Sequence, residues 1–149
     1  MRAILEEQEF YEYAYDIVIQ PRDMNMSRHA DHKSIIAYVH DSRANYLREL
    51  GLSEQDLGDG KTGDVLGDMV INYKKECFTF DALRFLVHLS IVSDKAFRMF
   101  YKAVNKDTGD TVMLAEAGFV CFDYQKRAVS EVPEQLISAT ENFIANGKG

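Results

Sequence analysis

The chain has 149 residues, of which 46% are hydrophobic and 28% charged, and its formal net charge is -7. This length and apolar fraction predict one globular domain over residues 1–149 with a core of its own. The acidic balance disfavours nucleic acid or an anionic membrane as the main partner. No apolar run is long enough to span a bilayer, and the stretch MRAILEEQEF turns acidic too early for a signal peptide. We therefore expect a cytoplasmic enzyme or binding protein.

The first predicted element is a strand over residues 10–20. Every second residue there is aromatic or β-branched, which is the period of a half-buried strand, and Pro21 ends it because proline cannot donate to the sheet. From Ser34 to Leu50 the apolar spacing changes to three and four, which predicts an amphipathic helix. Asp31 or Ser34 can cap its start, and Gly51 can end it in a left-handed conformation.

Four more strand-like runs follow, over residues 65–80, 83–92, 97–105 and 111–123. The short polar turns between them predict an antiparallel meander, and a terminal helix is expected over residues 133–144. Cys77 and Cys121 lie in apolar runs without metal-ligand spacing, which favours reduced, buried thiols over a disulfide. One long helix can cover only the concave face of such a sheet, so the sheet edge and convex face are expected to meet partners in a homo-oligomer.

The turn before the helix reads DMNMSRHADH over residues 23–32, the helix carries Asp41-Ser42-Arg43, and it closes with Leu50-Gly51. In this order and spacing the chain resembles hotdog-fold acyl-CoA thioesterases of the 4-hydroxybenzoyl-CoA thioesterase type. The resemblance implies an α+β hotdog fold, in which a five-stranded antiparallel sheet wraps a long central helix and a C-terminal helix follows. It covers roughly residues 9–136.

Two departures from the family pattern concern the turn. Asn25 stands where the family usually has its catalytic aspartate, and Asp31-His32 stands where many members have a pair of asparagines. A neutral amide cannot take a proton, so Asn25 could only position a water or polarise a carbonyl group. The acid or base is therefore expected to be Asp31, then Asp41 on the helix, then His29, because an imidazole can act as a base near neutral pH.

The resemblance also implies that the backbone N–H of His32, at the electropositive helix N-terminus, faces the developing oxyanion. Asp31 could instead be only a helix cap, Asp41 only a solvated charge, and Asn25 only a turn residue. Two histidines beside two carboxylates could suggest a metal, but no further ligands cluster nearby, so no metal site is expected.

Lys95, Arg98 and Lys102 are expected to alternate along one face of a strand. A solvated surface would explain them, but the resemblance makes contact of Lys95 and Arg98 with a coenzyme A phosphate equally plausible. Coenzyme A enters only as part of the substrate, and no separate cofactor is expected.

The function expected from the resemblance is hydrolysis of an acyl-CoA or acyl-carrier thioester by a homodimer or homotetramer. Two alternatives stay open. The same fold could hydrate or dehydrate a hydroxyacyl thioester with a histidine and an acid, or Asn25 could mark a non-catalytic acyl-thioester binding module.

Overall fold

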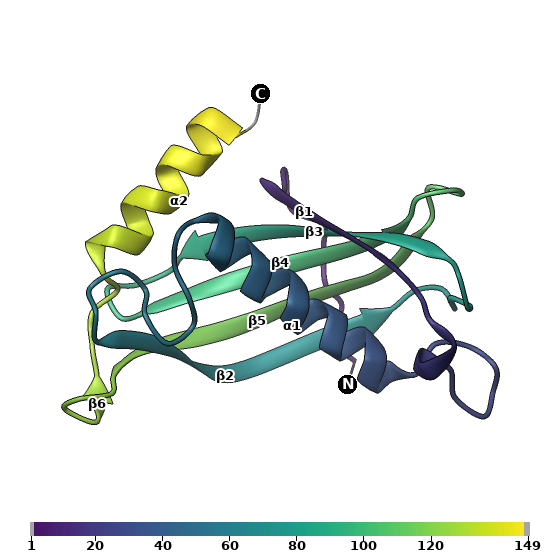
Figure 1. Ribbon diagram of the computed structural model, residues 1–149, viewed down its shortest axis with the longest axis horizontal. Helices are drawn as coiled ribbons and strands as arrows, with labels where there is room; N and C mark the ends of the chain where they lie inside the picture. Colours follow the sequence, from purple (N-terminus) through teal and green to yellow (C-terminus); the bar gives the residue numbers. More distant parts are fainter. Residues whose placement is uncertain (1, 148–149) are drawn as a thin grey trace.

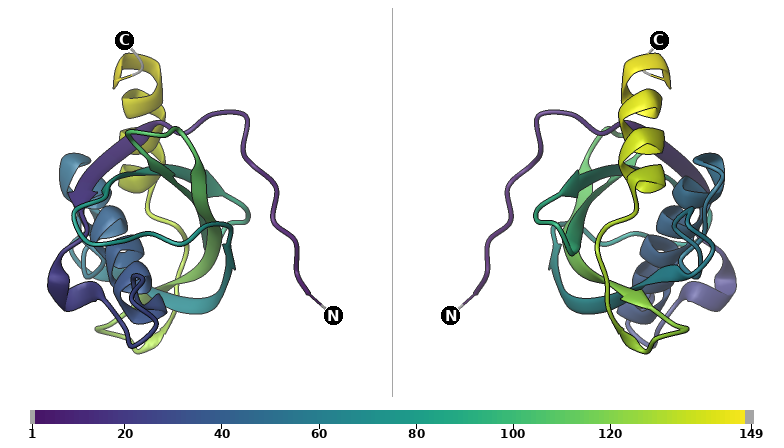
Figure 2. Two further views of the ribbon diagram at one scale, coloured as in Figure 1. Left: turned by 90° about the vertical axis from the view of Figure 1, so that its right-hand side faces the viewer. Right: turned by 90° about the vertical axis from the view of Figure 1, so that its left-hand side faces the viewer.

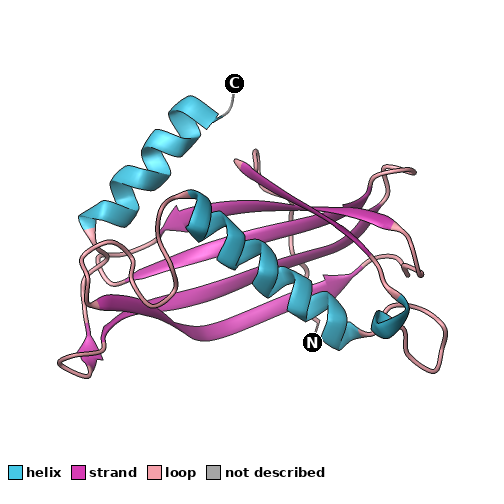
Figure 3. Cartoon of the chain, in the orientation of Figure 1, coloured by secondary structure: helices cyan, strands magenta, loops and turns pink. Residues whose placement is uncertain are grey.

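A curved antiparallel sheet forms the framework of the protein, whose computed structural model describes residues 2–147. The long strands are β1 (Tyr13–Val18), β2 (Thr62–Tyr73), β3 (Ala82–Ile91), β4 (Ala96–Asn105) and β5 (Thr111–Asp123), in the spatial order β1-β3-β4-β5-β2. A two-residue strand, β6 (Ala128–Val129), adds to β5. The predicted α+β hotdog architecture is confirmed, with this short sixth strand in addition (Figures 1 and 3).

The position of β2 in the sheet differs from the predicted meander. Only β3, β4 and β5 follow one another as hairpins, whereas β2 pairs with β5 at the sheet edge. The prediction that β2 continues to Phe80 and turns into β3 is wrong. β2 ends at Tyr73, because the N–H groups of Lys74 and Lys75 both donate hydrogen bonds to the carbonyl oxygen of Val112, which breaks the strand register. The chain then leaves the sheet as the loop 74–81.

The central helix α1 (His32–Glu49) lies across the concave face of the sheet (Figure 1). Its buried stripe includes Ile35, Val39, Tyr46 and Leu47, which meet the inward residues of the strands. On β4 these are the alternate residues Phe97, Met99, Tyr101 and Ala103, all buried. Each large apolar side chain removed from water contributes roughly 1.5–3 kcal/mol, so this layer supplies the main stabilisation. Gly51 ends the helix with φ +78°, as its place in the sequence predicts.

The C-terminal helix α2 (Glu134–Gly147) buries Leu136 and Thr140 near the C-terminal end of α1. Phe143 lies 5.4 Å from the ring of Tyr46, which in turn stacks on Tyr13 at 4.9 Å. This aromatic group joins α2, α1 and β1. It lies at the opposite end of α1 from the turn that precedes the helix.

The N-terminal segment 2–12 runs over the face of the sheet opposite α1 (Figure 2). The side-chain amide of Asn72 accepts a hydrogen bond from the N–H of Leu5 and donates one to the carbonyl oxygen of Ala3. Glu7 forms an ion pair with Lys102 on the same face. Part of the convex face is therefore covered by the chain itself, while the outer edge of β2 has no neighbouring strand in the described residues.

Candidate active site

The turn before α1 is organised by Asn25. After the short 3-10 helix η1 (Pro21–Asp23), the side-chain oxygen of Asn25 accepts hydrogen bonds from the backbone N–H groups of Ser27 (2.9 Å) and His29 (3.5 Å). Its own backbone N–H donates to the carbonyl oxygen of His29 at 3.0 Å. Asn25 therefore acts here as a turn-forming residue that fixes the position of His29, a role its short polar side chain suits.

The first turn of α1 has free backbone donors. Asp31 occupies the N-cap position with extended backbone angles, yet its side chain makes no cap hydrogen bond. Its carboxylate lies instead 3.0 Å from Nδ1 of His32. Among the described residues, the N–H groups of His32 and Lys33 have no acceptor. Uncapped donors at a helix N-terminus can bind an anionic oxygen.

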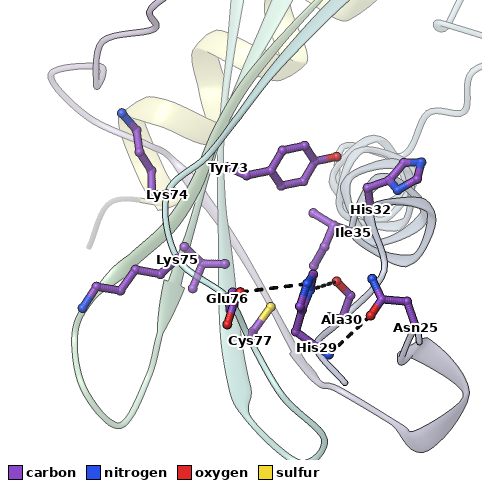
Figure 4. A pocket seen from close by; sticks show the side chains of 11 residues that line it. Asn25, His29, Ala30, His32, Ile35, Tyr73, Lys74, Lys75, Glu76 and Cys77 are labelled. Carbon is purple, nitrogen blue, oxygen red and sulfur yellow. Dashed lines mark hydrogen bonds and ion pairs between the residues drawn. The ribbon is translucent and has the colours of Figure 1, made fainter. Parts of the chain in front are cut away.

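A pocket of about 310 Å³ opens beside this helix end, between the turn 25–30 and the segment 73–77, which begins with the last residue of β2 (Figure 4). Its lining mixes polar and apolar side chains: Asn25, His29, Ala30, His32, Ile35, Tyr73, Lys74, Lys75, Glu76, Cys77 and Val112. The two walls are joined by a hydrogen bond of 2.7 Å from the N–H of Ala30 to the carbonyl oxygen of Cys77. The pocket is therefore a built feature of the fold.

His29 points into this pocket with a defined tautomer. Its Nδ1 lies 3.1 Å from the carbonyl oxygen of Ala30, which can only accept, so Nδ1 carries the proton. In the neutral ring Nε2 is then an unprotonated acceptor, and it lies 3.9 Å from Oε1 of Glu76. An imidazole held in this way can accept a proton from a bound molecule.

The other predicted acid and base residues are distributed differently. His32 lines the pocket, but its side chain is 65% exposed and is paired with Asp31. The carboxylate of Asp31 is not part of the lining. Asp41 lies on the exposed face of α1, and its backbone oxygen accepts a hydrogen bond from Asn45. The structure therefore brings Asn25, His29 and His32 to one pocket and leaves the carboxylates of Asp31 and Asp41 outside it.

Most residues of the second pocket wall were missed by the sequence reasoning, among them Tyr73 and Glu76. The hydroxyl of Tyr73 points across the pocket toward the first turn of α1 (Figure 4). Burial and the negative charge of Asp31 raise the pKa of this phenol, so it remains a hydrogen-bond donor. Burial also raises the pKa of the Cys77 thiol to about 11, which keeps it protonated and a poor nucleophile. Cys77 and Cys121 are both buried and free, as predicted.

Lys95 and Arg98 do not lie at the pocket. Lys95 precedes β4 in the turn from β3, so it does not alternate with Arg98 as predicted. The guanidinium of Arg98 binds Asp68 through two nitrogens (3.0 and 2.8 Å) and Glu116 through Nε (2.8 Å). Its planar fork is thus occupied by carboxylates of the same chain.

No group of three or more His, Cys, Asp or Glu side chains converges within residues 2–147 in a way that could hold a metal ion. In the same residues, neither helix is long and apolar enough to cross a membrane.

Three solved structures share this fold and are distant from the chain in sequence. A 1,4-dihydroxy-2-naphthoyl-CoA thioesterase from Synechocystis superposes with a TM-score of 0.79 at 16% identity, covering 87% of this chain and 96% of that chain. A DHNA-CoA thioesterase from Staphylococcus aureus gives 0.75 at 15% identity, with 91% and 92% covered. The gentisyl-coenzyme A thioesterase BH1999 gives 0.73 at 16% identity, with 86% and 99% covered. The architecture therefore defines the chain as a hotdog-fold protein.

Family membership follows from the sequence itself. Residues 19–140 match the family described as the thioesterase-like superfamily. The chain belongs to this superfamily, which places it among the thioester hydrolases. No curated protein sequence matches the chain significantly.

Proposed function

We propose that the protein hydrolyses an acyl-CoA, or an acyl group on a carrier protein, in the pocket at the N-terminus of α1. The observation that carries the proposal is that His32, whose backbone N–H has no acceptor among the described residues, lines a pocket that also holds a histidine base. The N–H of Lys33, the next residue of the helix, is likewise without an acceptor there. Such donors stabilise the oxyanion of acyl transfer, and the loss of one typically costs about a hundred- to thousandfold in rate. The CoA thioesters named for the solved structures of this fold support a CoA substrate.

In this reaction His29 is the general base. Its Nε2 takes a proton from water as the water oxygen attacks the thioester carbonyl carbon. The oxyanion forms near the N–H groups of His32 and Lys33. When the C–S bond breaks, the proton on Nε2 passes to the departing thiolate, so that free acid and thiol result. His29 is preferred to Asp31 because its ring lines the pocket, whereas the Asp31 carboxylate pairs with His32.

The acting species is proposed to be a cytoplasmic homo-oligomer, with a dimer as its first unit. β2 spans Thr62–Tyr73 and has β5 as its only neighbouring strand in the described sheet. The loop before it bonds to Thr62 and Asp64, but the rest of its outer edge has no backbone partner in the described residues. Val65, Leu66 and Tyr73 are exposed on it. A long edge strand with exposed apolar residues favours pairing with another strand. Because Tyr73 also lines the pocket, a second copy at this edge would help to enclose the substrate.

The experiment that tests the proposed reaction follows free thiol with a chromogenic disulfide, using purified protein and CoA esters of short, long, branched and aromatic acids. Acyl groups on a carrier protein form a second panel. Thiol release with at least one ester is expected. Formation of an enoyl thioester from a hydroxyacyl thioester without thiol release would establish the dehydratase alternative. Tight binding without turnover of any ester would establish the binding module.

A further inference from the structure

The pocket contains one carboxylate that no sequence motif indicated. Neither Asp31 nor Asp41 belongs to the lining, and position 25 carries an amide. In the described lining the acidic side chain is Glu76, which comes from the loop 74–81 more than forty residues along the chain from His29. Glu76 and His29 point toward each other across the pocket (Figure 4).

The backbone holds Glu76 in this place. On one side of it, the N–H of Lys75 donates to the carbonyl oxygen of Val112 at 3.1 Å. On the other side, the carbonyl oxygen of Cys77 accepts the N–H of Ala30 at 2.7 Å. Both anchors come from elements that form the fold, so residue 76 is fixed next to the turn that carries His29. Its side chain is 65% exposed and is not part of the core.

The separation of the two groups suits a shared water. Oε1 of Glu76 lies 3.9 Å from Nε2 of His29, which is too long for a good direct hydrogen bond. Because Nδ1 is committed to Ala30, the neutral ring presents Nε2 as an acceptor, and the carboxylate also accepts. For a water oxygen about 2.8 Å from both acceptors, the angle from one acceptor through the water oxygen to the other would be roughly 90°. This is close to the angle between the two O–H bonds of water, so one water could donate to both.

We propose that Glu76 is a catalytic residue that holds and activates the hydrolytic water together with His29. This role rests on the proposed thioester hydrolysis. One O–H of the water donates to Nε2 of His29 and the other to the Glu76 carboxylate. The water oxygen attacks the carbonyl carbon, its first proton passes to Nε2, and Glu76 keeps its charge and stabilises the imidazolium. The imidazolium then returns the proton to the departing thiolate. Glu76 thus supplies the negative charge that a family aspartate would supply from position 25.

The test uses Glu76→Gln, which keeps the size of the side chain and removes its charge. We expect kcat for thiol release to fall about 10- to 100-fold, with KM within about threefold of the wild type. The matched control is Asp110→Asn. Asp110 carries an exposed carboxylate that binds Lys75, the residue before Glu76, but Asp110 does not line the pocket. This control should retain the wild-type kcat.

A second variant, Glu76→Ala, separates a chemical role from a structural one. Added formate should restore part of its kcat, because a free carboxylate can occupy the vacated position. A kcat of Glu76→Gln within threefold of the wild type, or an equal loss in Asp110→Asn, would overturn the role of Glu76 while leaving the hydrolysis intact. Failure of the wild type to release thiol from any ester would refute the proposed function instead, so the two failures are distinguishable.

Discussion

The carboxylate of Asp31 lies 3.0 Å from Nδ1 of His32 and does not cap the helix whose N-cap position it occupies. An aspartate at this position normally accepts a hydrogen bond from one of the first free N–H groups of the helix. Here the side chain turns to its neighbour, and the N–H groups of His32 and Lys33 remain available to a ligand. A lost cap typically costs about 1 kcal/mol of stability, which is small beside the value of preorganised donors to acyl transfer.

The first prediction concerns the role of Asp31 itself. Asp31→Ala is expected to lower kcat/KM by less than about tenfold, because the carboxylate does not line the pocket. Steady-state thiol release measures the effect, with Asp41→Ala on the exposed face of α1 as the matched control. A loss above a hundredfold in Asp31→Ala alone would assign the base to Asp31, as the sequence first suggested.

The second prediction concerns stability and pH. Oδ2 of Asp64 is buried without a hydrogen-bond partner in the described residues. Burial, and secondly the negative charge of Glu54, raise the pKa of Asp64 from 3.8 to about 7, although Arg43 opposes the shift. Tyr101 and Cys121 are the other titratable groups that interact with this carboxylate.

Because the pKa of Asp64 is higher in the folded than in the unfolded chain, the folded protein loses stability as the pH rises. Between pH 4 and pH 7 the unfolded chain has lost the Asp64 proton while the folded chain keeps it. The contribution of Asp64 to the free energy of unfolding is therefore full below pH 4. It falls by up to about 1.4 kcal/mol per pH unit until pH 7 and is constant above. Asp64→Asn should remove this fall, so the stability of the variant relative to the wild type should rise from pH 5 to pH 7.

Urea unfolding of the wild type and of Asp64→Asn at several pH values measures how the difference in their free energies of unfolding changes with pH. The matched control is Asp68→Asn on the same strand, because the ion pair with Arg98 lowers the pKa of Asp68 out of this window. A constant difference between wild type and Asp64→Asn across pH 5–7 would show that Asp64 is ionised throughout.

The third prediction concerns the free edge of β2. Replacing both Val65 and Leu66 with arginine should convert a dimer into a monomer, because two cations per copy would face their equivalents across the paired edges. Light scattering coupled to size exclusion gives the mass. Val129→Arg, at an exposed apolar position on β6, is the control that should leave the mass unchanged. An unchanged mass in the double variant would place the interface elsewhere.

The fourth prediction concerns Lys95 and Arg98. Their replacement by alanine should change KM for a CoA ester by less than about twofold, since neither lines the pocket and Arg98 is already bound by Asp68 and Glu116. Initial rates over a range of ester concentrations measure KM. A tenfold rise in KM with unchanged kcat would instead support contact of Lys95 and Arg98 with a coenzyme A phosphate, as the resemblance implied.

Much of the fold could be predicted because its elements carry strong local patterns. α1 has a clear apolar stripe and a glycine at its end, β3 and β4 alternate cleanly, and β5 is a long, mostly buried apolar run bounded by polar turns. The end of β2 could not be predicted, because the aromatic and apolar residues after Tyr73 still look like a strand. The pairing of β2 with β5 is a tertiary choice that periodicity does not encode.

The composition of the site was only partly predictable for the same reason. His29 and His32 were found because they lie within one short turn. Glu76 was missed because its approach to His29 depends on the hydrogen bond between Ala30 and Cys77, which joins segments far apart in the sequence. The orientation of Asp31 was missed because local pattern favours a cap, and the competing contact with His32 is a matter of side-chain geometry.

The claim that His29 is the general base is tested most directly by measuring thiol release by His29→Gln and by the wild type on the same CoA ester. The account predicts a loss of about a hundredfold or more in kcat with little change in KM, because glutamine can bond to Ala30 but cannot take a proton. His32→Gln should stay within about fivefold of the wild type, because its backbone N–H is retained. A His29→Gln protein with the wild-type kcat would contradict the account.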